Sequence, residues 1–206
     1  MKLSVFDHGL IQITDPDGRI FTGIAEALSA EYCLHAYGRG EDALRIGSYV
    51  FYASGIAKIE SQPRMAIVRV VETWQQAGAY YVRIQAMAKK HHITLRQEFD
   101  AHDTPDTKYI VVTDSDFPIA TARMYPLDRK SVMIGRVVVL PEYRHRGIGS
   151  MVVRECEAWA EELGYAKAVV ESRDNKVAFY QQMHYAVCGE PTEGDTFRCI
   201  QMEKQL

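Results

Sequence analysis

Residues 132–163 contain a continuous apolar segment, then a short basic loop, then a long amphipathic segment. This order limits the folds that the chain can adopt. The segment VMIGRVVVL (132–140) is apolar almost throughout, which is typical of a strand covered on both faces of its sheet. After the loop, apolar residues recur at the spacing of one helix face: Val152, Cys156, Trp159, Ala160 and Leu163. We therefore predict a strand–loop–helix unit within an α/β domain.

The loop itself, PEYRHRGIGS (141–150), places two arginines and two glycines where the helix begins. The first N–H groups of a helix lack partners inside the helix, and the helix dipole adds positive potential there. Glycine at positions 147 and 149 leaves these amides open to an anion, while Arg144 and Arg146 add positive charge. The loop is therefore predicted to bind a phosphate or pyrophosphate, although it matches neither GxxxxGK[ST] nor GxGxxG.

Around this unit, residues 64–206 show a mixed α/β pattern. We predict strands at 80–84, 108–113, 118–125 and 167–172, with the turn signal DSDF joining the second and third as a hairpin. Residues 86–100 are expected to be helical in part. Asp174 or Asn175 is expected to cap a short helix that ends near Met183, and residues 185–190 and 196–204 are expected to complete the sheet.

Residues 1–60 show a different pattern of short apolar segments separated by glycine-containing turns. This spacing predicts a small, strongly bent antiparallel β-barrel. The alternative is an additional sheet that packs on the main domain. Pro63 and its polar neighbours mark a boundary, so we predict a barrel at 1–62, a linker at 63–77 and the α/β domain at 78–206.

Composition excludes several classes of protein. A net charge of −3 over 206 residues argues against a protein that binds nucleic acid over its whole surface. No apolar segment approaches the roughly 20 residues of a membrane span, and the first residues lack the apolar core of a signal peptide, so we expect a cytoplasmic protein without membrane contact. The four cysteines are far apart and the histidines lack ligand spacing, so neither a disulfide nor a metal site is predicted.

Two motifs resemble those of one enzyme family, the GNAT-type N-acetyltransferases. RHRGIG (144–149) fits that family's (Gln/Arg)-x-x-Gly-x-(Gly/Ala) signature, and NKVAFY (175–180) is similar to its second signature. The resemblance covers about residues 78–206. It implies a splayed mixed sheet that binds acetyl-CoA and transfers the acetyl group directly to the amine of a small molecule or protein.

The resemblance also implies where the cofactor lies. The pantetheine arm would run beside the backbone of Val137, Val138 and Val139, and Asn175 would contact the cofactor unless it serves only as a helix cap. The pyrophosphate would bind the loop, formed by Arg144, His145, Arg146, Gly147, Ile148, Gly149 and Ser150.

The same resemblance places Tyr180 beside the CoA sulfur as a hydrogen-bond donor, with a packed aromatic side chain as the alternative. Several family members carry a glutamate on the strand before the loop, but the two matching positions here hold Met133 and Gly135. Glu171 is the nearest substitute as a base, while Glu98 and Asp100 belong to the segment that lines the acceptor side in the family. Surface charges and a base relayed through water are the alternatives.

The N-terminal segments resemble the two halves of an Sm-like barrel motif over about residues 8–60. RNA-binding members carry an Asp-x-x-Met-Asn loop and an Arg-Gly loop, whereas this chain has AEYCLH and GS at these places. RNA binding is therefore not expected. We expect instead that this segment is a docking or homo-oligomerisation module. For the whole chain we expect an N-acetyltransferase, with a non-catalytic CoA-binding sensor or interaction module as the alternative.

Overall fold

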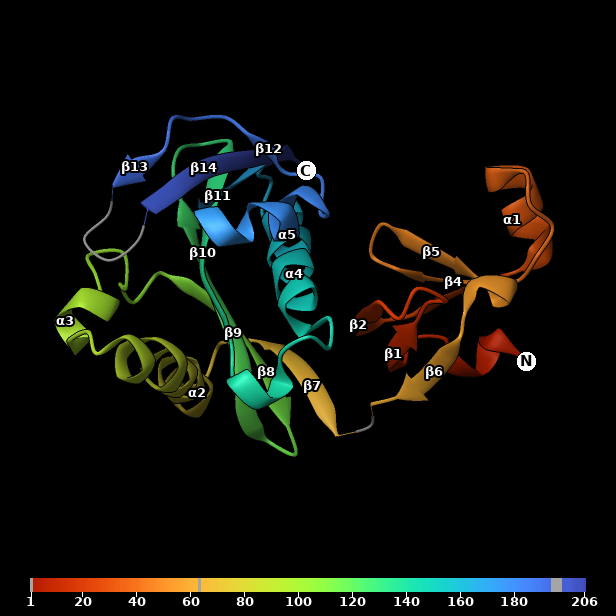
Figure 1. Ribbon diagram of the computed structural model, residues 1–206, viewed down its shortest axis with the longest axis horizontal. Helices are drawn as coiled ribbons and strands as arrows, with labels where there is room; N and C mark the ends of the chain where they lie inside the picture. Colours follow the sequence, from red (N-terminus) through yellow and green to blue (C-terminus); the bar gives the residue numbers. More distant parts are fainter. Residues whose placement is uncertain (1, 63, 194–197) are drawn as a thin grey trace.

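The computed structural model describes residues 2–62, 64–193 and 198–206, which form a larger and a smaller lobe (Figure 1). The larger lobe is built on an eight-stranded mixed sheet of order β12-β14-β11-β10-β9-β8-β7, in which β13 also pairs with β14. The strands are β7 (Met65–Arg69), β8 (Lys108–Asp114), β9 (Phe117–Pro126), β10 (Ser131–Val139), β11 (Lys167–Arg173), β12 (Ala186–Val187), β13 (Thr192–Glu193) and β14 (Arg198–Gln205).

Helices cover both faces of this sheet (Figure 1). On one face lie α2 (Thr73–Arg83), its π-helical continuation η3 (Ile84–Lys89) and α3 (Leu95–Glu98). On the other lie α4 (Ile148–Glu162) and α5 (Val177–Gln181), the latter preceded by the short turn η5 (Asp174–Lys176). The turn η4 (Pro141–Tyr143) links β10 to the loop before α4.

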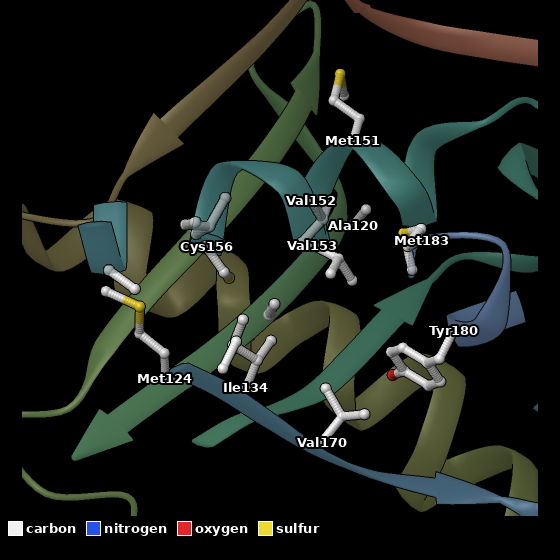
Figure 2. Close-up of a cluster of buried hydrophobic side chains, with 14 of the residues drawn as sticks. Ala120, Met124, Ile134, Met151, Val152, Val153, Cys156, Val170, Tyr180 and Met183 are labelled. Atoms are coloured by element: carbon white, nitrogen blue, oxygen red, sulfur yellow. The ribbon is translucent and has the colours of Figure 1, made fainter. Parts of the chain in front are cut away.

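The main hydrophobic core lies between α4, α5 and the sheet (Figure 2). Val132 and Ile134 of β10 contribute to it, whereas Val138 of the same strand packs on the opposite face against α2 and η3. This two-sided burial explains the apolar sequence of the strand and confirms the strand–loop–helix prediction.

The smaller lobe contains two three-stranded sheets, of order β2-β1-β6 and β3-β4-β5. The described strands do not close into the single barrel that the sequence predicts. The elements are η1 (Leu3–Phe6), β1 (Leu10–Thr14), β2 (Ile20–Ile24), β3 (Glu26–Leu28), α1 (Ala30–Tyr37), β4 (Ala43–Ile46), β5 (Tyr49–Tyr52), η2 (Ala53–Gly55) and β6 (Lys58–Ser61). Side chains of both sheets share one core with Leu3 of η1 and with Ala25 between β2 and β3. The buried members of this core are Leu3, Ile11, Ile13, Ala25, Leu44, Ile46 and Phe51.

The segment 64–84 differs most from expectation. Residues 80–84 were predicted to form a strand but form the end of α2 and the first residue of η3, and α2 begins after a capping box between Glu72 and Gln75. The buried residues Ala79, Val82 and Ala86 follow the spacing of one helix face. This helical pattern over the longer segment outweighs the strand-like alternation within residues 80–84. Residues 65–69 and 73–77, expected in a linker, form β7 and the first turn of α2, while Pro63 lies outside the described residues.

The smaller lobe packs on the α4 side of the larger one, with β2 beside the start of α4 (Figure 1). Within the described part of the chain, no helix is both long and apolar enough to span a membrane.

Candidate active site

The central sheet opens between β10 and β11. These parallel strands pair only at Ser131–Met133 with Lys167–Val169. Beyond these residues, β10 remains paired with β9 as far as Val139, and β11 remains paired with β14 as far as Arg173. Residues 134–139 thus have a strand neighbour on one side only, and an opening separates them from the end of β11.

A β-bulge shapes the β10 side of this opening. The register with β9 shifts between Gly135 and Val138, and Arg136 within the bulge has a φ of +50°, a conformation uncommon for residues other than glycine. As a result, Val137 and Val139 pack on the α4 side, whereas Val138 packs on the α2 side. The three valines predicted to line the pantetheine arm therefore point their side chains to both faces, and only their backbone lies along the opening.

The loop between β10 and α4, which we call the glycine loop (residues 141–150), leaves backbone donors without partners. His145 and Gly147 have φ values of +61° and +73°, and Gly147 is the N-cap of α4. No side chain caps this helix, and the Gly147 N–H has no hydrogen-bond acceptor among the described residues. Together with the N–H groups of Ile148 to Ser150, it supplies the donors that a phosphate group needs at a helix N-terminus.

The two arginines of the loop make different contacts. Arg144 Nε donates to the carbonyl oxygen of Val139 at 2.9 Å, which ties the loop to the end of β10. The guanidinium of Arg146 lies 5.3 Å from the centre of the Tyr143 ring, and this residue is exposed. Because a guanidinium carries five donors, Arg144 retains donors for an anion despite its structural bond.

The two glycines of the loop also differ in what surrounds them. A Cβ on Gly147 would lie 2.6 Å from the backbone nitrogen of Thr22 in β2, a distance too short for any side chain. A Cβ on Gly149 would lie 3.5 Å from Phe179 of α5, which is an ordinary contact. Gly147 is therefore required by the smaller lobe and by its positive φ, whereas the packing of α4 against α5 does not require a glycine at 149.

Tyr180 lies on α5, buried beside the rings of Phe179 and Tyr185 at centroid distances of 4.9 and 5.7 Å. Figure 2 shows its hydroxyl end directed toward the side of Ile134 and Val170, which belong to the two strands that separate. Burial raises the pKa of Tyr180 well above its usual value of 10.0, so the phenol keeps its proton at neutral pH. Tyr180 can therefore pack as an aromatic residue of the core and also direct its hydroxyl toward the opening.

Glu171 occupies the opposite face from Tyr180. Side chains alternate along β11, so Glu171 faces the side of α2 and α3, while Val170 faces α4. Glu171 is exposed to solvent. Asn175 is exposed in η5, and neither it nor Asp174 caps α5, whose N-cap residue is Lys176. The predicted capping role is therefore wrong, which leaves the Asn175 amide available to a ligand.

The α2 side of the opening is fixed by ion pairs that sequence reasoning missed. Arg83 pairs with Glu98 and Asp103, and Arg123 pairs with Asp100 and Asp103. Arg136 of the bulge also reaches Asp100, with its Nη2 3.0 Å from Oδ2. We call these six residues the buried ion network: Arg83, Glu98, Asp100, Asp103, Arg123 and Arg136.

The buried ion network decides the roles of two predicted candidates. Burial alone raises the pKa of Asp100, but hydrogen bonds from Arg123 and the His102 amide outweigh it and lower the pKa. Glu98 is only 1% exposed and accepts from Arg83. Both carboxylates are held by arginines, so neither is a free base. Their charge in the sequence gave no sign of burial, because most charged residues in surface segments are solvated.

Comparisons with known proteins agree with this geometry. The model of the family described as "Acetyltransferase (GNAT) family" matches residues 70–185, more than half of the chain. An uncharacterized acetyltransferase of Streptococcus pyogenes serotype M3 is 26% identical over 112 residues, covering 54% of this chain and 79% of that protein. The uncharacterized N-acetyltransferase YjcF of Bacillus subtilis is 26% identical over 116 residues, covering 56% and 81%.

Solved structures show the same fold in the larger lobe. A crystal structure from Lactobacillus plantarum is similar with a TM-score of 0.66 and 29% identity, covering 69% of this chain and 98% of that one. Escherichia coli ElaA is similar in fold with a TM-score of 0.60 and 20% identity, covering 68% and 99%. The family match and the splayed sheet, with its glycine loop and tyrosine, lead to one conclusion. The chain belongs to the GNAT family of acetyltransferases.

Proposed function

We propose that the protein transfers the acetyl group of acetyl-CoA directly to a primary amine, without an acyl-enzyme intermediate. The observation that carries this proposal is the opening between β10 and β11, which runs into the glycine loop at one end. Tyr180 lies on one face of the sheet beside this opening and Glu171 on the other. A thioester in the opening would thus be reached by a donor from one side and by an amine from the other.

The residues around the opening fit the parts of acetyl-CoA. The partnerless N–H groups from Gly147 to Ser150, with Arg144, His145 and Arg146, are assigned to the pyrophosphate. The unpaired side of β10 at residues 137–139 is assigned to the amide groups of the pantetheine arm. Asn175, exposed before α5, is assigned a polar contact with the same cofactor.

The amine must lose a proton before or during attack. An alkyl amine with a pKa of about 10.4 is mostly protonated at pH 7, and deprotonation costs roughly 4–5 kcal/mol. We assign Glu171 to this task, directly or through a water molecule, because it is exposed on the α2 side and bound to no arginine in the described structure.

The amine nitrogen then forms a bond to the thioester carbonyl carbon, and the C–S bond breaks. The electron pair of that bond leaves on sulfur, and the second proton of the nitrogen passes to water, because Glu171 or its water molecule has already taken the first. The Tyr180 hydroxyl, kept protonated by burial that raises its pKa, donates a hydrogen bond or its proton to the departing sulfur. Atoms and charge therefore balance without a further cofactor.

Free thiol released from acetyl-CoA measures this activity directly. The protein would be incubated with acetyl-CoA and a panel of amines: a peptide N-terminus, a lysine peptide, a polyamine, an aminoglycoside and free amino acids. Acetylation of at least one acceptor, confirmed by product mass, is the expected result. No turnover with any class, together with no binding of acetyl-CoA, would contradict the proposal.

A second candidate is a CoA-binding sensor or interaction module without catalysis. One observation favours it: β10 offers no carboxylate at Met133 or Gly135, and Glu98 and Asp100 are bound to arginines. Cofactor binding that survives Tyr180→Phe, with no acetylation by either form, would support this candidate. Docking of a partner or homo-oligomerisation through the smaller lobe remains a proposal in both cases.

A further inference from the structure

The smaller lobe contacts the backbone of the glycine loop through one buried side chain. Thr22 of β2 is 0% exposed, and its hydroxyl donates to the carbonyl oxygen of Arg146. Gln12 of β1 supports this contact, because its Nε2 lies 3.2 Å from Thr22 Oγ1 and 3.3 Å from the same Arg146 oxygen. Two side chains of the smaller lobe thus hold one carbonyl group of the larger lobe.

Holding this carbonyl also orients the next amide. In a trans peptide the C=O and N–H groups point in opposite directions, and the described residues contain no cis peptide. With the Arg146 oxygen fixed on the Thr22 side, the Gly147 N–H must point away from the smaller lobe. This N–H has no acceptor among the described residues, and it is one of the donors assigned above to the pyrophosphate.

Strand β2 also packs closely against this peptide. A Cβ on Gly147 would be 2.6 Å from the Thr22 nitrogen, 2.9 Å from the Ile20 oxygen and 3.0 Å from Phe21 Cα, so β2 lies directly against the loop. Little space therefore remains on that side for another loop conformation.

A second contact fixes Thr22 from the other side. Arg154, on the second turn of α4, donates from Nη2 to the Thr22 carbonyl oxygen at 2.9 Å. Gly47 is required here, because a Cβ at that position would lie 2.4 Å from Arg154 Cδ. Thr22 is thus bonded to the loop by its hydroxyl and to the helix that follows the loop by its carbonyl.

We propose that Thr22, supported by Gln12, is a positioning residue for acetyl-CoA: it fixes the Arg146–Gly147 peptide so that the Gly147 N–H is presented to the pyrophosphate. The smaller lobe is then part of the cofactor-binding apparatus, although it lies outside the residues matched by the family. This inference rests on the proposed use of acetyl-CoA.

The test compares two ligands, one with the pyrophosphate and one without it. Binding of CoA and of pantetheine, which lacks the pyrophosphate, would be measured by titration calorimetry on the full chain. Thr22→Val removes the hydroxyl at nearly constant volume and is expected to weaken CoA binding about threefold to tenfold, the range for one hydrogen bond. Pantetheine binding is expected to stay unchanged, and Thr22→Ser is expected to restore CoA affinity.

Two further variants separate positioning from general loosening. Tyr49→Phe removes another hydroxyl contact between the lobes, from Tyr49 to the carbonyl oxygen of Gln182, without touching the loop, so CoA affinity should not change. Gln12→Ala changes a partly exposed contact and therefore tests the same carbonyl should Thr22→Val fail to fold. It is expected to weaken CoA binding by a smaller factor than Thr22→Val does.

Each other outcome overturns the inference. Unchanged or tighter CoA binding by both Thr22→Val and Gln12→Ala would show that the contact does not present the amide. Equal weakening of CoA and pantetheine, or equal weakening by Tyr49→Phe, would show a structural role only. Failure of the unaltered protein to bind CoA would instead contradict the proposed function, so the two failures are distinguishable.

Discussion

Arg83 Nε donates to Glu98 Oε1 at 2.8 Å inside the larger lobe, where the two side chains are 0% and 1% exposed. Arg83 also donates from Nη2 to the Glu98 carbonyl oxygen and pairs with Asp103. One arginine at the end of α2 therefore holds both the end of α3 and the loop that follows it. Because this segment covers the α2 side of the opening, that side, from which we propose that the amine approaches, is fixed by buried charge rather than by apolar packing alone.

Removal of the Arg83 charge is expected to destabilise the larger lobe strongly. Arg83→Met leaves the carboxylates of Glu98 and Asp103 buried without this partner, and loss of one member of a buried pair typically costs about 3–5 kcal/mol. The free energy of unfolding would be measured by urea denaturation. Lys167→Met is the matched control, because its pair with Glu203 is about one-third exposed and should cost about 1 kcal/mol or less. An equal decrease in the free energy of unfolding in both variants would show that burial of the network does not increase its contribution to stability.

Acid is expected to destabilise the protein through Asp103. Burial alone raises the pKa of this carboxyl, but hydrogen bonds from Arg83 and Tyr109 outweigh it and hold the pKa below the ordinary 3.8. A lowered pKa in the folded state contributes stability that is complete above pH 3.8 and is lost as the pH falls further. Asp103→Asn should therefore be less stable at pH 7, yet lose less stability between pH 5 and 3. Parallel pH curves for both proteins in denaturation experiments would contradict this assignment.

A methyl group at Gly147 is expected to cost more than one at Gly164, although both residues have positive φ, +73° and +86°. A Cβ at Gly164 meets nothing within 4 Å, so Gly164→Ala reports the backbone cost alone, about 1–2 kcal/mol. Gly147→Ala adds the collision with β2 and should also weaken CoA binding, which Gly164→Ala should not. Thermal unfolding and calorimetric titration would measure the two effects. Similar stability and CoA affinity in the two variants would show that β2 does not press on the loop.

Loss of the Tyr180 hydroxyl is expected to lower kcat with little change in the KM for acetyl-CoA. Tyr180→Phe removes the donor to the departing sulfur, and a positioned general acid typically contributes about 10²- to 10⁴-fold. Because burial raises the pKa of Tyr180 above 10.0, its ionisation should not reduce kcat between pH 7 and 9 in the unaltered protein. Tyr185→Phe, a neighbouring buried ring, is the control and should retain activity. Equal activity of Tyr180→Phe and the unaltered protein would remove Tyr180 from the reaction.

Loss of the Glu171 carboxylate is expected to change the pH profile. Glu171→Gln should lower kcat/KM by about 10²-fold or more at pH 7 and recover toward high pH, where the amine loses its proton unaided. Glu161→Gln, an exposed carboxylate on α4, should behave like the unaltered protein. Rates measured from pH 6 to 10 would decide this. A Glu171→Gln profile parallel to that of the unaltered protein would favour deprotonation through water without this residue.

The parts of the site that the sequence predicted are those whose residues lie close together along the chain. β10, the glycine loop and α4 follow one another within residues 131–162. The spacing of apolar residues, the glycines and the arginines within this one segment are therefore enough to predict all three. The hairpin of β8 and β9 was predicted for the same reason. The sequence predicted that a glycine at 147 leaves the backbone amides open to an anion. The second reason for this glycine, the close approach of β2, is visible only in the folded chain.

The parts that sequence reasoning missed depend on contacts between distant residues. Thr22 and Arg146 are 124 positions apart, and no local pattern marks a threonine that will bond a loop carbonyl. The buried ion network was missed because each charge taken alone predicts exposure, and only the complete set of partners permits burial. The strand predicted at 80–84 was wrong because five residues with strand-like alternation lie inside a longer helical pattern.

The early separation of β10 from β11 gives this sheet a free edge in its interior. Edges normally lie at the margins of a sheet, where charge or twist discourages further pairing. Here residues 134–139 form an edge inside the sheet, paired with β9 on one side and facing the opening toward the end of β11 on the other. A pantetheine arm would complete the sheet as a missing strand does, so slowed amide hydrogen exchange along residues 134–139 should report cofactor binding directly.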